Sequence, residues 1–278
     1  MNQLSTESRA KIMACLVEGL SIRSTSRITG FSINTIMKLI SRVGFQCMRY
    51  QDEVFNNLSC KRIEVDEIWA FCEMKEKKVP DARKGELGLG DVYTWVALCP
   101  ETKIVPCYLV GRRDLEHAKD FIDDLASRLK HRIQLTSDGH KPYLEAVEGA
   151  FGSDIDYAML VKNYGGERTY KDGTTKKCRR SECSSITTWV IAGQPNPEKI
   201  STSLIERQNL TMRMSMRRFT RKTNAHSKKF WNHQCAIAMH FMWYNFARIH
   251  ETLRITPAME AGLTDRLWSF EDIVSLKT

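Results

Sequence analysis

The pattern of apolar and polar residues predicts three short helices between residues 5 and 44. Within each segment, apolar side chains recur every three or four positions, as on the buried face of an amphipathic helix. A serine that can cap the helix precedes each segment, and a glycine follows it; these pairs are Ser5 and Gly19, Ser21 and Gly30, and Ser32 and Gly44. We therefore predict an all-α domain over residues 1–45, followed over residues 46–61 by a linker, for which a short helix is the alternative.

The third predicted helix has a polar and basic face that includes Asn34, Lys38 and Arg42. A short turn containing glycine precedes this helix. That arrangement is typical of a helix-turn-helix, whose last helix enters the major groove of DNA. These three residues are therefore candidate DNA contacts. Three-helix units also occur as plain packing modules, and the pattern leaves that alternative open.

Runs of β-branched and aromatic residues predict a sheet in the middle of the chain. The expected strands cover residues 62–71, 91–99, 103–110, 132–136 and 155–161, and residues 187–192 could add another. Helical spacing predicts helices over residues 114–130 and 142–151, and a long apolar one over residues 227–249. Three strands followed by helix, strand, helix, strand and helix is the order of a ribonuclease-H-like α/β fold with a mixed five-stranded sheet. We expect this core over residues 62–250, with residues 251–278 as a tail packed on it.

A basic segment rich in glycine, serine and threonine interrupts the expected core at residues 163–185. Its cations are Arg168, Lys171, Lys176, Lys177, Arg179 and Arg180. We expect a mobile basic loop here. Such a loop suits contact with a phosphate backbone, and an uninvolved solvated insertion fits the same composition.

Asp66 lies in the middle of the first predicted strand, within a run rich in β-branched and aromatic residues. Burying a lone carboxylate is costly, so an ionised aspartate in such a strand usually has a cation or a metal as its partner. Asp138 follows the fourth predicted strand, and sites in open α/β sheets gather at the carboxyl ends of strands. Glu206 lies in a helix expected to open at residues 201–203. These three acids are the candidates for one site.

Three carboxylates can hold two Mg²⁺ ions about 3.5 to 4 Å apart, which together activate a nucleophile and stabilise a leaving oxygen in phosphodiester cleavage. Mg²⁺ takes carboxylate oxygens as ligands, and Mn²⁺ can substitute for it. Asp66, central in its strand, would bridge both ions. Asp138 would complete one metal site and Glu206 the other.

The helix that carries Glu206 is predicted to place Asn209, Arg213 and Arg217 on the same face, because these positions are offset by three, seven and eleven residues. Together with Arg207, these side chains are candidate contacts to DNA near the scissile bond. His140 and Asn209 are also candidates for orienting the metal ligands or water, although a structural hydrogen bond would equally explain His140.

The charge distribution indicates a polyanionic partner. The formal net charge is +9, and it is concentrated: residues 1–62 contain nine basic and four acidic residues, and residues 199–230 contain nine and one. Concentrated positive charge usually means nucleic acid. A solvated basic face without a ligand remains the alternative.

The nine cysteines are scattered and form no Cys-x-x-Cys motif, which argues against a disulfide framework and against structural zinc. The N-terminus is polar, and no apolar run reaches the roughly 18 residues that a membrane span needs. These features favour a cytoplasmic protein with no membrane partner.

Several motifs resemble those of the DDE transposases of the insertion sequence 1 family. They are VDEIW at 65–69, TSDG at 136–139, SLIERQN at 203–209 and MSMRRFT at 214–220. The segment YNFARIH at 244–250 is similar to the closing motif of many retroviral-integrase-like transposases. The resemblance implies that Asp66, Asp138 and Glu206 are the catalytic triad, that Mg²⁺ is the cofactor, and that the protein acts on its own element's ends. Some family members carry an N-terminal zinc finger, whose cysteine spacing this sequence lacks.

We therefore predict a transposase that cleaves double-stranded DNA at terminal inverted repeats and transfers the freed 3′-hydroxyl into target DNA. Because two element ends must be bridged, at least a homodimer is expected. Two alternatives remain open. A ribonuclease-H-like nuclease would hydrolyse strands without joining them, and a DNA-binding regulator or inactivated transposase would bind the ends without catalysis.

Overall fold

The computed structural model describes residues 4–170, 172–220 and 222–277. It begins with three helices, α1 (Thr6–Val17), α2 (Ile22–Thr29) and α3 (Ile33–Val54). The three predicted caps are confirmed, because the hydroxyls of Ser5, Ser21 and Ser32 each accept a hydrogen bond from the backbone amide three residues later. Gly30 ends α2 with a φ of 76°, a left-handed conformation that favours glycine.

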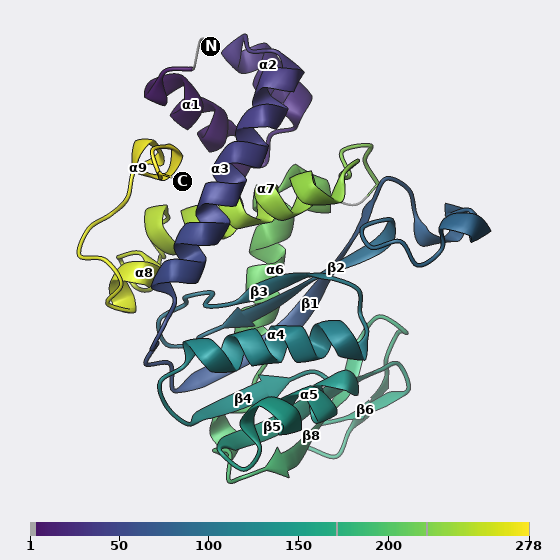
Figure 1. Cartoon of the computed structure of the whole chain (residues 1–278). Helices are drawn as coiled ribbons and strands as arrows, with labels where there is room; N and C mark the ends of the chain where they lie inside the picture. The colour runs from purple at the N-terminus through teal and green to yellow at the C-terminus, as the bar shows by residue number, and fades with distance from the viewer. Residues whose placement is uncertain (1–3, 171, 221, 278) are drawn as a thin grey trace.

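Helix α3 does not end before Gly44, so that prediction is wrong. The helix continues to Val54, and residues 46–54 belong to it and not to a linker. The reason is tertiary: a side-chain carbon at Gly44 would lie only 2.4 Å from Cβ of Cys235 in α7 (Phe230–Met242). Glycine here permits close approach of two helices. The crossing of α3 and α7 is visible in Figure 1.

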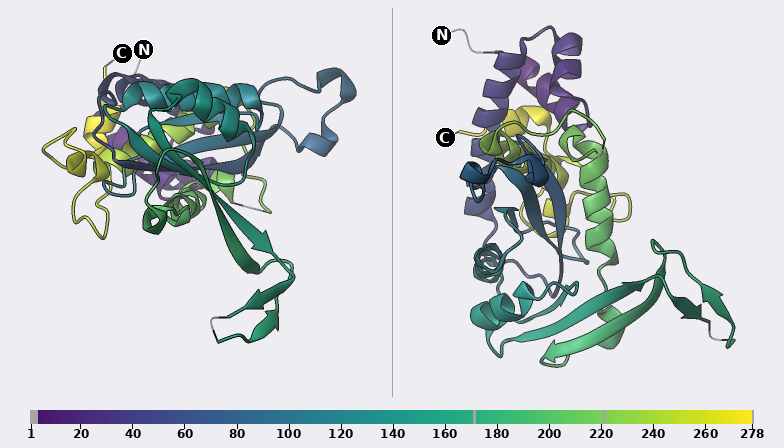
Figure 2. Two further views of the ribbon diagram at one scale, coloured as in Figure 1. Left: turned by 90° about the horizontal axis from the view of Figure 1, so that it is seen from below. Right: turned by 90° about the vertical axis from the view of Figure 1, so that its right-hand side faces the viewer.

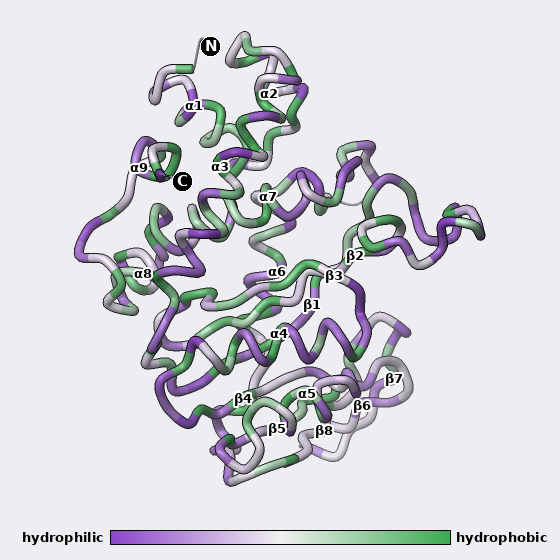
Figure 3. Tube along the Cα trace, in the orientation of Figure 1, coloured by the Kyte–Doolittle hydropathy of each residue, from purple (hydrophilic) through white to green (hydrophobic). Residues whose placement is uncertain are grey.

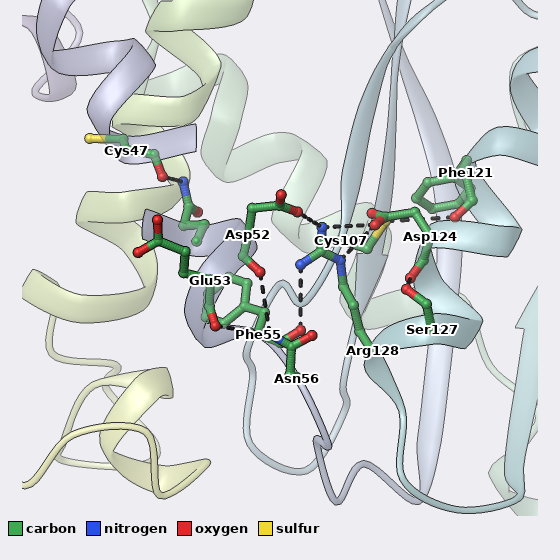
Figure 4. A network of polar contacts seen from close by, with 11 residues as sticks. Cys47, Asp52, Glu53, Phe55, Asn56, Cys107, Phe121, Asp124, Ser127 and Arg128 are labelled. Atoms are coloured by element: carbon green, nitrogen blue, oxygen red, sulfur yellow. Dashed lines mark hydrogen bonds and ion pairs between the residues drawn. The ribbon is translucent and has the colours of Figure 1, made fainter. Parts of the chain in front are cut away.

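The C-terminal end of α3 is also attached to the core through Arg128, the last residue of α4 (Leu115–Arg128). Its guanidinium donates to Asp52 at 2.7 Å, to Asp124 at 2.9 Å and to the carbonyl oxygen of Phe55 at 3.4 Å (Figure 4). Arg128 is buried, and two carboxylates balance its charge. The helical N-terminal part is therefore fixed against the sheet-bearing part by packing and by ion pairs.

The central sheet has six strands, in the order β3-β2-β1-β4-β5-β8. They are β1 (Arg62–Cys72), β2 (Gly90–Leu98), β3 (Tyr108–Gly111), β4 (Ile133–Ser137), β5 (Ile155–Tyr164) and β8 (Cys183–Ala192). Strands β1, β2 and β3 form an antiparallel meander, β4 is parallel to β1, and β5 is parallel to β4. This is the expected ribonuclease-H-like core. The count of five strands is one too low: residues 187–192, expected as a possible further strand, lie in β8, which pairs antiparallel with β5. The third strand is also shorter than the expected 103–110.

Helices cover both faces of the sheet. Figure 1 shows α4 and α5 (Pro142–Phe151) on the near face, and Figure 2 shows α6 (Ser203–Ser215) on the other. The capping of α4 by Asp114, whose side chain accepts from the amide of His117, confirms the predicted start of that helix. Trp95, Phe121 and Tyr143 are among the largest fully buried side chains between these layers. In Figure 3 hydrophobic segments run through the sheet, whereas the β1–β2 loop, which contains two 3-10 turns (Glu76–Lys78 and Asp81–Arg83), includes long hydrophilic stretches.

The expected mobile loop over residues 163–185 is instead a β arm. Strands β5 and β8 continue together beyond the body of the sheet, with Tyr164 opposite Cys183. A small hairpin of β6 (Glu167–Thr169) and β7 (Thr175–Lys177) forms the tip, and Figure 2 shows the arm projecting from the molecule. Lys171, one of the predicted cations, lies outside the described residues.

The C-terminal elements pack back on the rest of the chain, and the last helix packs mainly against α1. The long apolar helix is shorter than expected: α7 ends at Met242, and a π-helical turn, Trp243–Ala247, follows it. Helix α8 is Pro257–Glu260 and α9 is Phe270–Val274. Arg9 of α1 donates to the carbonyl oxygen of Val274 at 2.7 Å, so the two ends of the chain are joined. Among the residues that the structure describes, no helix is long and apolar enough to span a membrane.

Candidate active site

The three predicted acids line one pocket of about 650 Å³. Asp66 lies in β1, Asp138 follows β4, and Glu206 lies in the first turn of α6. Strands β1 and β4 are parallel, with Glu64 opposite Thr136, and Asp66 and Asp138 each lie two positions beyond that pair. The strand register therefore places these two carboxylates side by side.

A buried glutamate on β1 determines where Glu206 lies. Oε2 of Glu64, a residue only 3% exposed, accepts hydrogen bonds from the backbone amides of Leu204 at 2.9 Å and Ile205 at 3.0 Å. The first amides of a helix have no partner within it, and Thr202 provides no side-chain cap for α6. Burial raises the pKa of Glu64, although the two amide hydrogen bonds act in the opposite direction. Glu64 thus attaches the start of α6 to the strand that carries Asp66.

Asp66 is held by two donors. Its carboxylate accepts from the backbone amide of Glu67 at 2.8 Å and from the side-chain amide of Asn209 at 2.9 Å. Burial, together with the negative charges of Asp138 and Glu206, raises the pKa of Asp66 to about 6. A carboxylate in this environment favours a positive partner.

Asn209 was one of the predicted DNA contacts, and the structure contradicts that role. Its side chain is 2% exposed and points to Asp66, so it does not face a ligand at the surface. The other expectation, that Asn209 orients a candidate metal ligand, agrees with this hydrogen bond. Asn209 is buried because it lies one turn beyond the buried Ile205, on the side of α6 that packs against β1.

Two basic side chains accompany the other two acids. Nη2 of Arg113 lies 3.5 Å from Asp138, whose carboxylate also accepts from the backbone amide of His140 at 2.9 Å. Lys162 of β5 forms an ion pair with Glu206, which also accepts from the hydroxyl of Thr202 at 2.8 Å. The pocket therefore brings together carboxylates and cations, a composition suited to a charged phosphate substrate.

Glu67 is a fourth acid of this site, and the sequence reasoning missed it. Carboxylate oxygens of Asp66, Glu67 and Asp138 lie within 4.8 Å of one another. Glu67 accepts from Nε of Arg113 at 2.9 Å, and burial raises the pKa of Glu67 to about 7. Neighbouring residues of a strand point to opposite faces of the sheet, so Glu67, directly after Asp66, was not expected to share a site with it.

The donor set fits a hard divalent cation. Closely spaced carboxylate oxygens are the ligands that Mg²⁺ and Mn²⁺ take in proteins. Burial, and after it the negative charges of Asp138 and Glu206, raises the pKa of Asp66, and a bound cation would offset both effects. Glu206 lines the same pocket but, among the described residues, is not within the 4.8 Å group. Of the three predicted acids, Asp66 and Asp138 are thus the two that the fold brings into direct proximity.

The remaining predicted site residues are placed as follows. Asn34, Lys38 and Arg42 are exposed on α3 at intervals of four, and therefore form one stripe. Arg207 is exposed and Arg213 is partly buried on α6. Arg217 lies in a 3-10 turn (Arg217–Phe219) beyond the end of that helix. The predicted single helical face from Glu206 to Arg217 is therefore wrong.

The imidazole of His140 lies beside Trp95, with ring centroids 5.7 Å apart, and its Nε2 has no hydrogen-bond partner within the described part of the chain. Burial, together with the charge of Arg113, lowers the pKa of His140. Its backbone amide, and not its ring, contacts Asp138.

Comparison with known proteins gives no family assignment. No family model matches the chain, and a search of curated proteins finds no significant match. Among solved structures, the chain is similar to the Mos1 transposase paired-end complex with left transposon end, at 11% identity and a TM-score of 0.25, over 56% of this chain and 60% of that one. It is also similar to the Mos1 strand transfer complex, at 11% identity and a TM-score of 0.25, over 88% of this chain and 78% of that one. The chain thus spans about three fifths of the first of these structures.

Proposed function

We propose that this protein is a DDE transposase, which cleaves DNA at the ends of an insertion sequence and transfers the freed 3′-hydroxyl into target DNA. The observation that carries the proposal is the convergence of Asp66, Asp138 and Glu206 in one pocket, from a strand, a strand end and a helix that are distant in the sequence. The basic side chains of Arg113 and Lys162 beside these acids match a phosphodiester substrate better than a neutral one.

In this function Asp66 and Asp138 would hold one divalent cation, and Asp66 and Glu206 would hold another. When bound, Mg²⁺, or Mn²⁺ in its place, supplies activation of the attacking oxygen and neutralisation of charge at the phosphorus. Asn209 keeps the Asp66 carboxylate in a fixed orientation through its hydrogen bond. Thr202 does the same for Glu206.

The basic residues have a separate role. Arg113 and Lys162 balance the acids when the carboxylates have no cation, and are free to donate to the phosphate when those charges are neutralised. Arg207, Arg213 and Arg217 would contact the backbone on either side of the scissile bond. Asn34, Lys38 and Arg42 would contact the terminal inverted repeat in the major groove. The two ends of the insertion sequence must be held together, so the active species would be at least a homodimer.

The test uses wild-type protein and Glu206→Gln with labelled duplex from the two flanks of the coding region, in Mg²⁺, in Mn²⁺ and in EDTA. We expect metal-dependent nicking and joining by the wild type, and loss of both in Glu206→Gln with DNA binding retained. Nicking without joining would favour the nuclease. Binding without chemistry in the wild type would favour the regulator, for which triad mutations would have no effect.

A further inference from the structure

A groove of about 520 Å³ lies between α3 and the start of α7, apart from the acidic pocket. Its cations are Lys38 and Arg42 from α3 and Lys229, the residue before α7. Within the described part of the chain, the residues that line this groove include no acid. Three basic side chains therefore line one depression, and an anionic ligand there would neutralise their charges.

Two aromatic rings form the apolar part of the same groove. Phe45 and Trp231 are 40% and 45% exposed, and their ring centroids are 6.1 Å apart. Large aromatic side chains exposed next to cations are typical of surfaces that bind a ligand. A bound ligand would cover these rings, and removing them from water is favourable.

The groove has a fixed shape because α3 and α7 are joined directly beneath it. Ser41 donates to the side chain of Asn232 at 3.1 Å, and Gly44 allows the helix backbone to approach Cys235. The positions of Lys38 and Arg42 relative to Lys229 are therefore set by packing, as a binding surface for a regular polymer requires.

The groove also continues the exposed stripe of α3. Asn34, Lys38 and Arg42 follow one another at intervals of four, and Phe45 comes next on the same side. Beyond Phe45 the following cation, Arg49, is paired with Glu53 at 3.4 Å. The stripe of the helix-turn-helix thus leads into the groove and across to α7.

We propose that this groove binds the sugar–phosphate backbone of the same DNA duplex that α3 contacts. Lys229, together with Arg42 at the edge of the major groove, binds phosphates, and the rings of Phe45 and Trp231 pack against the deoxyribose between them. The inference rests on the proposed function and adds a binding residue, Lys229, from outside the helix-turn-helix. Its consequence is that the DNA is held jointly by α3 and by a helix of the core, so the bound duplex has a fixed orientation relative to the acidic pocket.

The experiment measures binding of labelled duplex by fluorescence anisotropy over a range of salt concentrations, with full-length Glu206→Gln as the reference protein. Lys229→Ala in that background should weaken binding about three- to tenfold and reduce the slope of log K against log salt by about one, as expected for one lost phosphate contact. Trp231→Ala should weaken binding and leave the slope unchanged, because it removes no charge.

The matched control is Lys119→Ala, which removes the same charge from α4, where Lys119 is paired with Glu145. It should bind DNA as the reference does. Lys229→Gln removes the same charge and retains more of the side chain. Circular dichroism of both Lys229 variants shows whether they are folded. If Lys229→Ala and Lys229→Gln bind with the affinity and salt slope of Lys119→Ala, the groove does not bind DNA. If the reference protein itself binds no duplex, the proposed function fails and the groove assignment fails with it.

Discussion

The side-chain amide of Asn209 donates a hydrogen bond of 2.9 Å to the carboxylate of Asp66, a residue 143 positions earlier in the chain. Asn209 lies three positions after Glu206 on α6. One helix therefore contributes a candidate metal ligand and also the group that orients another ligand on β1. This arrangement makes the geometry of the acids depend on the docking of α6.

Replacing Asn209 tests that dependence. Asn209→Ala should lower the affinity for Mn²⁺ about 10- to 100-fold, because a ligand that has lost its orienting partner binds less well. Titration followed by electron paramagnetic resonance measures the affinity directly. Leu210→Ala, an exposed change on the same helix, is the control and should behave as wild type. Equal affinities in the two variants would refute the orienting role.

Replacing Glu64 tests the attachment of α6 to β1. Glu64→Ala leaves the amides of Leu204 and Ile205 without their acceptor in a buried place, so the free energy of unfolding should fall by about 1–3 kcal/mol. Glu64→Gln retains an acceptor oxygen and should lose less. Urea unfolding measures both. A Gln variant as unstable as the Ala variant would show that the charge, and not the hydrogen bonding, is what matters.

Lys162 and a divalent cation should compete for Glu206. The ammonium group contacts the Oε1 atom that a cation would take, so Lys162→Gln should raise the Mn²⁺ affinity severalfold. The same variant should join DNA more slowly, because a contact to the phosphate is lost. Lys141→Gln removes an equal charge from the lining of the same pocket and should change the metal affinity less. Weaker metal binding in Lys162→Gln would contradict the competition.

The raised pKa of Asp66 predicts a pH-dependent stability in metal-free protein. The folded state binds the Asp66 proton more tightly than the unfolded chain, so this group stabilises the fold fully below its usual pKa of 3.8. That contribution is lost as the pH rises to about 6. Asp66→Asn should remove it. Glu67 contributes to stability with the same sign up to about pH 7. The contribution of Asp66 is therefore measured as the difference in the free energy of unfolding between wild type and Asp66→Asn, from pH 4 to 7. Parallel curves would show that Asp66 has an ordinary pKa.

Local features of the sequence were sufficient to predict most helices and strands. The serine caps of α1, α2 and α3, the Asp114 cap of α4 and the proline start of α5 act within one turn, so nearby residues specify them. The selection of Asp66 and Asp138 also followed from sequence, because an acid within or directly after an apolar strand is rare without a partner.

Other features depend on contacts between residues far apart in the chain, and only the tertiary structure decided them. Gly44 predicted the end of a helix, yet it lies inside α3, where Cys235 approaches it from another helix. Glu67 joins the acidic group beside Arg113, and Asn209 turns inward to Asp66 through the placement of α6 against β1. The sequence by itself determined most of the elements, since capping and periodicity are local, and it indicated three of the four acids of the site. The neighbours of each acid, the β arm and the groove beside α3 depend on which surfaces pack together, which local patterns do not specify.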